Sequence, residues 1–177
     1  MLPSKLNDAE HVFKAARFDV YEIDRQGPDG QTHRRQLVVH PGAAVVLPLL
    51  DDDHVVMIRN DRPAVGKTLW ELPAGTLEPP EPPEMCAGRE LIEEAGFKAK
   101  SIEPMCDFYS TPGFCTEHMW VFIARDLTEV GQQLEATEQI TVEVLPLDKT
   151  MQMMRDGEII DGKTMTALLY HDAFMKG

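Results

Sequence analysis

Three acidic side chains with helical spacing are the first residues in the sequence that could do chemistry. Glu90, Glu93 and Glu94 stand at positions i, i+3 and i+4, so at about 100° per residue they lie within one arc of a helix. A solvated acidic stripe is the ordinary interpretation, although Glu90 and Glu94 repel each other at this spacing. A divalent cation would remove that repulsion, and Mg²⁺ is bound by a few carboxylates together with phosphate oxygens. The pattern therefore predicts either a solvated face or a metal site for phosphate chemistry.

Residues 83–95 form the helix that must position these carboxylates. This segment follows the proline-rich stretch EPPEPPE and ends before Gly96, a residue suited to the position after a helix. The side opposite the glutamates can pack against a sheet, and we expect it to contain Met85, Gly88, Leu91, Ile92 and Ala95. The acidic face would then point outward or into a cleft.

The remaining segments predict an α/β sandwich. FDVYEID and HRRQLVVH flank the turn QGPDGQ and predict an N-terminal hairpin. AAVVLPLL and HVVMIRN, joined by DDD, predict two buried strands linked by a tight turn. SIEPMCDFYS, HMWVFIARDL and VEVLPLD predict further strands, and residues 149–175 look mostly helical. We divide the chain into an N-terminal β-hairpin segment, residues 1–40, and a main domain, residues 41–177.

Composition restricts the partners. The formal net charge of −13 over 177 residues argues against a nucleic-acid polymer, because binding a phosphate backbone needs a basic face. No apolar run approaches the roughly 20 residues of a membrane helix, and MLPSKLNDAEHVF lacks the regions of a secretory signal. We therefore expect a cytoplasmic protein without a membrane partner. Cys86, Cys106 and Cys115 lack zinc-ligand spacing and are expected to be packing residues.

The predicted helix and the segment before it resemble a known family. Gly75, Glu81 and the run RELIEEAGF at residues 89–97 look like the Nudix box without a departure. The resemblance implies a Nudix hydrolase with an α/β/α sandwich and a mixed sheet, here preceded by a small N-terminal antiparallel β-sheet. It also implies a loop, helix and loop whose carboxylates bind divalent cations, and a substrate in which a nucleoside diphosphate is linked to another moiety.

The resemblance assigns roles by position. Glu90 and Glu94 would be the principal metal ligands, Glu93 a further ligand or a water-orienting group, and the carbonyl oxygen of Ala74 another ligand. The implied cofactor is Mg²⁺, with Mn²⁺ as a substitute.

Four other positions of the box have implied structural roles. Arg89 and Glu81 would form a buried ion pair that braces the loop, a role we favour over catalysis. Gly75 and Gly96 would be conformational residues, because glycine adopts backbone angles that other residues resist.

Segments outside the box resemble the ADP-ribose pyrophosphatase branch. HPGAAVVLPL, IRNDRPAVGKTLWELPAG, GEIIDGKT and Pro112 contribute to this resemblance. It implies Mg²⁺-dependent hydrolysis of the pyrophosphate bond of nucleoside diphosphate sugars, ADP-ribose favoured, to a nucleoside monophosphate and a sugar phosphate. Alternatives are hydrolysis of other nucleoside diphosphate derivatives, triphosphates or dinucleoside polyphosphates. A catalytically inactive Nudix-like ligand-binding module is a different class, and the intact acids of the box argue against it.

The resemblance to this branch also implies which residues contact the substrate. They are Phe18, Arg35, Arg62, Glu71 and Pro112. The two arginines would contact phosphates or the terminal ribose, and the glutamate would contact substrate or metal. The aromatic residue that stacks on adenine in some relatives falls at or near Ala16, with Arg17 adjacent, so the base preference stays open between ADP-ribose, GDP-mannose and UDP-sugars.

A general base must stand near the attacking water, and relatives often place a glutamate for it on a mobile loop. The segment GQQLEATEQ fits, with Glu138 the first choice, Glu135 the second and Glu93 the third, while Glu117 has a lesser claim.

The N-terminal hairpin is hydrophobic enough to need a partner surface. In this branch such segments exchange between subunits, so we predict a homodimer.

Overall fold

A strand buried on both faces, β4 (Ala43–Pro48), lies at the centre of the structure. The computed structural model describes residues 8–175, so residues 1–7 of the N-terminal segment lie outside the described range. β4 belongs to a four-stranded sheet of order β7-β4-β9-β8. Its other strands are β7 (Ala74–Thr76), β8 (Phe97–Tyr109) and β9 (His118–Glu129). β4 pairs in parallel with β9 and antiparallel with β7, which confirms the expected mixed sheet.

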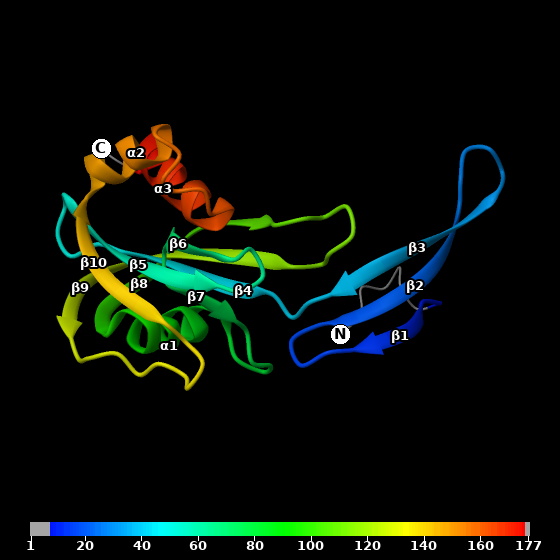
Figure 1. Cartoon of the computed structure of the whole chain (residues 1–177), viewed down its shortest axis with the longest axis horizontal. Coiled ribbons are helices and arrows are strands. Elements are labelled where there is room, and N and C mark those ends of the chain that lie inside the picture. The colour runs from blue at the N-terminus through cyan, green and yellow to red at the C-terminus, as the bar shows by residue number, and fades with distance from the viewer. Residues whose placement is uncertain (1–7, 176–177) are drawn as a thin grey trace.

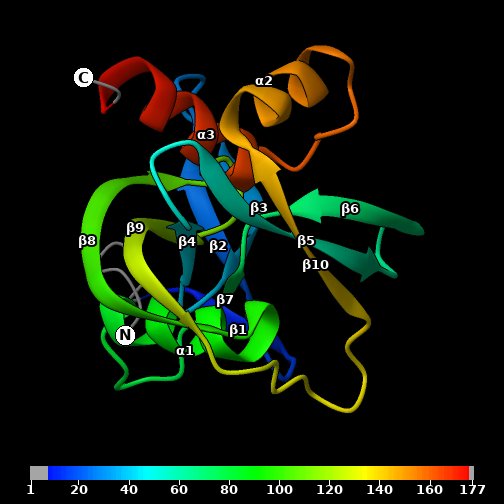
Figure 2. The same cartoon turned by 90° about the vertical axis from the view of Figure 1, so that its left-hand side faces the viewer.

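A second sheet and three helices complete the sandwich. The second sheet has the order β10-β5-β6 and consists of β5 (His54–Arg62), β6 (Lys67–Glu71) and β10 (Ile140–Pro146). The helices are α1 (Pro83–Ala95), α2 (Leu147–Arg155) and α3 (Gly162–Phe174). Figures 1 and 2 show α1 on one side of the strands and α2 with α3 on the other. The predicted α/β/α arrangement is confirmed.

Alternate residues of β4 enter two hydrophobic cores. Val45 and Leu47 pack in the core that α2 and α3 cover, whereas Ala44 and Val46 pack in the core that α1 covers. Because successive side chains of a strand point to opposite faces, this one strand serves both layers. Its continuous apolar sequence follows from burial on both sides.

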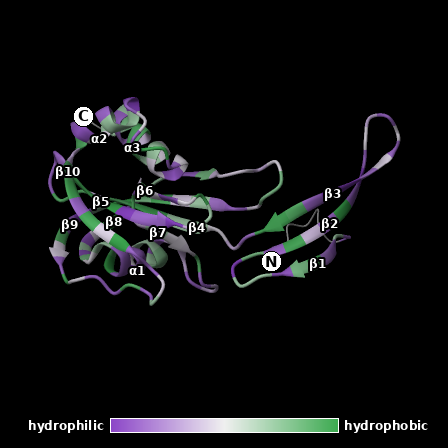
Figure 3. Cartoon of the chain, in the orientation of Figure 1, coloured by the Kyte–Doolittle hydropathy of each residue, from purple (hydrophilic) through white to green (hydrophobic). Residues whose placement is uncertain are grey.

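The N-terminal sheet has three strands in the order β1-β2-β3 and projects to one side of the sandwich (Figure 1). They are β1 (Glu10–Lys14), β2 (Asp19–Gln26) and β3 (Thr32–Val39). β2 and β3 confirm the predicted hairpin, whose turn contains Gly30 at φ 75°. Figure 3 shows β3 changing from hydrophilic residues near this turn to hydrophobic residues where the chain leads into β4.

Helix α1 begins and ends at the predicted residues, but its buried face differs from the prediction. Gly96 adopts φ 73°, and its N–H bonds to the carbonyl of Ile92, which ends the helix as the sequence indicates. Met85, expected against the sheet, is 64% exposed. Leu91 and Ala95 are buried as predicted, and Gly88 and Ile92 are half-buried. Cys86, Ala87, Glu90 and Glu94, which the prediction left off this face, are buried as well. Two rows at i, i+4 spacing face inward, so Glu90 and Glu94 lie under the neighbouring loop rather than in solvent.

The two apolar runs joined by DDD form β4 and β5 as predicted, yet the strands belong to different sheets. A single bridge, between Leu49 and Val55, joins them near the turn. β4 pairs along its whole length with β9, and β5 pairs with β10 and β6. Among residues 8–175 no helix is long and apolar enough to cross a membrane.

Candidate active site

A cavity of about 450 Å³ lies over the acidic side of α1. The predicted metal ligands and the three favoured general bases line it, whereas Glu117 lines another cavity: the residues here are Ala74, Glu90, Glu93, Glu94, Glu135 and Glu138. The loop after β9 supplies Glu135 and Glu138, and β7 with the loop that follows it supplies residues 74–79. Arg17 and Arg62 also line this cavity, so cations and carboxylates face the same space.

Glu90 and Glu94 are buried, with 8% and 4% of their surface exposed. Burial raises the pKa of Glu94 to about 8, although the N–H of Ala74, which donates to Oε2 of Glu94 at 2.8 Å, acts in the opposite direction. Burial also raises the pKa of Glu90 to about 7, against the charge of Arg89. Both carboxylates therefore lack the solvation that their charged forms require.

Gly75 makes room for Glu90. A Cβ atom built on this glycine would lie 1.7 Å from Oε1 of Glu90. The backbone of β7 thus approaches the carboxylate more closely than any residue with a side chain would permit, which explains this glycine by space rather than by a positive φ.

Arg89 connects the loop to the helix. Its Nε and Nη2 donate to the two carboxylate oxygens of Glu81, each at 3.0 Å. Its Nη1 donates to Glu90 at 2.7 Å and to Glu93 at 2.9 Å. The ion pair of Arg89 and Glu81 predicted from the sequence is present, although it is half-buried rather than buried. Arg89 also contacts two of the predicted metal ligands.

The donor set fits a hard divalent cation. Two buried carboxylates with raised pKa values gain most from a positive charge nearby, and oxygen ligands suit Mg²⁺ or Mn²⁺. Within residues 8–175, no three His, Cys, Asp or Glu side chains converge as a ligand set in this arrangement. Glu90 and Glu93 turn toward Arg89 instead, and Ala74 contacts Glu94 through its N–H.

Arg62 is held by a buried carboxylate, Glu71, which is 1% exposed. Nε and Nη2 of Arg62 donate to its two oxygens at 2.8 and 2.6 Å. Nζ of Lys163 donates to Oε2 of the same carboxylate at 2.5 Å. Both oxygens of Glu71 are therefore engaged by cations of the protein, so the structure places Glu71 behind Arg62 rather than free to bind substrate or metal.

Two further cavities share Arg17 with the acidic one. A cavity of about 600 Å³ contains Arg62, Lys163 and Glu117. The other, of about 690 Å³, contains Phe18 and Pro112. Arg17 therefore lies where the three spaces meet.

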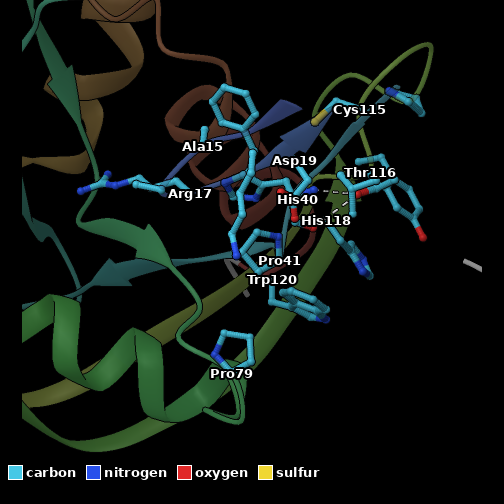
Figure 4. Close-up of a pocket in the computed structure, with 16 residues that line it drawn as sticks. Ala15, Arg17, Asp19, His40, Pro41, Pro79, Cys115, Thr116, His118 and Trp120 are labelled. Atoms are coloured by element: carbon cyan, nitrogen blue, oxygen red, sulfur yellow. Dashed lines mark hydrogen bonds between the residues drawn. The ribbon is translucent and has the colours of Figure 1, made fainter. Parts of the chain in front are cut away.

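The cavity that contains Phe18 and Pro112 has an aromatic wall. The ring of His118 stacks on Tyr109, with centroids 4.6 Å apart, and lies 4.3 Å from the ring of Trp120. Figure 4 shows His118, Trp120 and Pro79 lining this cavity. The wall can receive a planar ring by stacking.

Arg35 lies elsewhere. It is exposed on β3 opposite Ile23, and it is not among the described residues that line these three cavities. Lys163 and Asp161 also belong to the site but were not predicted from the sequence, although the segment GEIIDGKT contains both. The missing information was the partner of Lys163, which lies far away in the sequence on β6.

Comparison with known proteins identifies the family. The NUDIX domain model matches residues 39–168, so the chain belongs to the Nudix family. The prediction of a Nudix pyrophosphohydrolase is confirmed.

The relatives cover most of the chain. An ADP-ribose pyrophosphatase of Bacillus subtilis is 36% identical over 96% of this chain and 92% of its own length. A methanol dehydrogenase activator of Bacillus methanolicus is 32% identical over 96% and 93%, and a GDP-mannose pyrophosphatase of Salmonella typhimurium is 32% identical over 85% and 83%. The crystal structure of an ADP compounds hydrolase has a TM-score of 0.83 at 23% identity, covering 96% of this chain and 92% of that one, and shares the fold.

Proposed function

We propose that this protein hydrolyses the pyrophosphate bond of nucleoside diphosphate sugars, with ADP-ribose favoured, to a nucleoside monophosphate and a sugar phosphate. The observation that carries the proposal is the acidic cavity, in which the glutamates of α1 face Arg17 and Arg62. An anionic pyrophosphate needs cations in a protein whose formal net charge is −13. Relatives named ADP-ribose pyrophosphatase and GDP-mannose pyrophosphatase support this substrate class.

Glu90 and Glu94 would hold Mg²⁺, with Glu93 and the carbonyl oxygen of Ala74 as further ligands. When bound, Mg²⁺ would neutralise the charge of the pyrophosphate and activate a water molecule. The protein supplies the positions of these groups: Gly75 admits Glu90, and the N–H of Ala74 fixes Glu94.

Arg62 and Arg17 would orient the substrate. The fork of Nε and Nη2 of Arg62 is occupied by Glu71, which leaves Nη1 for a phosphate oxygen. Since Arg17 lies where the three cavities meet, its guanidinium can contact a ligand that extends from one into the next. Guanidinium groups suit phosphate because they are planar and always charged.

Glu138 is the proposed general base. It lines the acidic cavity, and its charge is among those that act on Glu90 and Glu94, although burial dominates both pKa shifts. Glu138 and Glu135 are also tied to each other, because the N–H of Glu135 donates to Oε2 of Glu138 at 2.9 Å. This contact holds the carboxylate on the loop and leaves Oε1 to accept a proton from water.

We propose that the nucleobase of the substrate stacks on the aromatic wall beside Phe18 and Pro112. Tyr109 is 57% exposed, so one of its faces can receive a ring. Purines and pyrimidines both stack on such a surface, which is why the wall by itself does not choose between ADP-ribose and GDP-mannose.

We also propose a cytoplasmic homodimer in which the N-terminal sheet meets a second copy. Val12 and Phe13 on β1 are 46% and 56% exposed, which favours a partner surface. Arg35 is exposed on the same sheet, so a contact with substrate would be made in the site of the partner. A monomeric mass by light scattering at micromolar concentration would remove this part of the proposal.

The decisive experiment measures release of monophosphate from ADP-ribose, GDP-mannose, UDP-glucose, a diadenosine polyphosphate and a nucleoside triphosphate, with Mg²⁺ and with a chelator. Glu94→Gln is the test variant, and Glu84→Gln, an exposed glutamate of the same helix, is its matched control. Cleavage of ADP-ribose, or of several sugar nucleotides, that needs Mg²⁺ and Glu94 supports the proposal. Cleavage of only the triphosphate or the diadenosine compound contradicts it, and binding of ADP-ribose without turnover identifies a ligand-binding module.

A further inference from the structure

Four side chains of alternating charge connect the start of α3 to the acidic cavity. Asp161 accepts from Nζ of Lys163 at 3.0 Å, and Lys163 donates to Glu71 at 2.5 Å. Glu71 in turn accepts two hydrogen bonds from Arg62. Arg62 lines the acidic cavity together with Glu94. We call these four residues, Asp161, Lys163, Glu71 and Arg62, the ion-pair chain.

The geometry at Glu71 shows what Lys163 contributes. Oε2 of Glu71 accepts from both Lys163 and Nη2 of Arg62, at 2.5 and 2.6 Å, while Oε1 accepts from Nε of Arg62. Lys163 thus makes a third hydrogen bond to the carboxylate, at the oxygen that Nη2 of Arg62 also contacts. This bond links the pair of Glu71 and Arg62 to the first turn of α3.

Lys163 is itself firmly placed. Asp161 caps α3 by accepting from the N–H of Thr164 at 3.0 Å. The hydroxyl of Thr164 donates to Asp161 and accepts from the N–H of Leu72, at 2.7 and 2.9 Å. Because Leu72 follows β6 directly, these bonds join the first turn of α3 to the strand that ends at Glu71. The side chain of Lys163 is 13% exposed, so water competes little for its contacts.

We propose that Lys163 is a positioning residue, which holds Glu71 so that Arg62 presents its guanidinium to the pyrophosphate of the substrate. This inference rests on the proposed role of Arg62 in substrate binding. It gives the C-terminal helix a part in catalysis, through a residue that acts by way of Glu71 and Arg62 rather than by touching the reacting atoms.

A measurement on the free protein tests whether Lys163 orders the ion-pair chain, without requiring any turnover. In a spectrum of arginine Nε–H groups, Arg62 should give a resolved signal that exchanges slowly with water, because its N–H donates to a buried carboxylate; the signal is assigned by its loss in Arg62→Lys. Lys163→Met should broaden this signal or speed its exchange at least severalfold, and Lys163→Arg should preserve it. Lys149→Met, which removes an exposed lysine of α2, is the matched control. An unchanged signal in Lys163→Met would overturn the inference.

Kinetics then test whether the effect passes through Arg62. On the best sugar nucleotide, Lys163→Met should lower kcat/KM on the order of tenfold, mainly through KM, with recovery in Lys163→Arg. In an Arg62→Ala background the same change should have almost no further effect, because a residue that acts only through another shows complete coupling. Additive losses would mean that Lys163 contacts substrate directly, which contradicts a positioning role. If the parent protein cleaves none of the panel, the proposed function is wrong. The Nε–H signal still shows whether Lys163 holds Glu71 and Arg62 in place.

Discussion

Gly75 and Glu90 lie so close together that a single methyl group on residue 75 would overlap the carboxylate, with a Cβ 1.7 Å from Oε1 and 2.0 Å from the carboxyl carbon. The contact joins β7 to the middle of α1. A carboxylate in such contact cannot move aside easily, because Glu90 is 8% exposed and is surrounded by protein.

Gly75→Ala should therefore abolish most activity by displacing Glu90, with a loss of about 100-fold or more in kcat/KM. The matched control is Gly88→Ala in α1, where a Cβ would meet only Cδ1 of Ile102 at 3.2 Å, the end of a flexible side chain. Turnover assays on purified, folded variants check this. Near-parental activity in Gly75→Ala would show that Glu90 has room to move.

The raised pKa values of Glu90 and Glu94, about 7 and about 8 against an ordinary 4.5, predict how stability depends on pH without metal. Between pH 4.5 and pH 8 these two carboxyl groups bind more protons in the folded protein than in the unfolded chain. The free energy of unfolding should therefore fall as the pH rises through this range. Mg²⁺ should consequently stabilise the protein more at pH 8 than at pH 6. Urea unfolding at both values, with and without Mg²⁺, measures this, and Glu94→Gln should flatten the metal-free slope while Glu84→Gln leaves it unchanged.

Arg89→Ala should lower the free energy of unfolding by about 2 to 3 kcal/mol, because it removes contacts to Glu81, Glu90 and Glu93 and leaves part-buried carboxylates without a cation. Arg89→Lys should recover only part of this loss, since an ammonium cannot reproduce the two-nitrogen contact with Glu81. Denaturant titration gives both values. Equal stability of the alanine and parent proteins would show that the ion pair contributes little.

Glu138→Gln should lower kcat by about 100-fold or more with little change in KM, as removal of a general base does. Glu135→Gln, whose N–H still donates to residue 138, is the neighbouring comparison. Steady-state kinetics decide between the candidates. If Glu138→Gln stays within a few-fold of the parent while Glu93→Gln is inactive, the base lies on α1.

Local signals made the helix and the hairpin predictable. Pro83 at the start of α1 and Gly96 after its end define a helix by themselves, and the Pro-Asp-Gly turn defines the β2–β3 hairpin. The sheet membership of β4 was not predictable in this way. Its six residues are all buried, so no alternation marks a face, and its partner β9 comes about 75 residues later.

The sequence predicted the glutamates of the box, and also Arg62, Glu135 and Glu138 outside it, but not how these residues are buried or paired. Burial of Glu90 and Glu94 depends on how α1 packs against the sheet, and a periodic pattern gives the arc of the glutamates but not its direction. The role of Glu71 was equally hidden, because its partner Lys163 lies 92 residues away.

The double burial of β4 has a consequence for how the protein unfolds. Val45 belongs to one core and Val46 to the other, so both layers depend on the same strand. We therefore expect the two layers to melt as one cooperative unit. The sandwich should then give a single calorimetric transition, in which the Mg²⁺ proposed to bind beside α1 should also delay the melting of α2 and α3 on the far side.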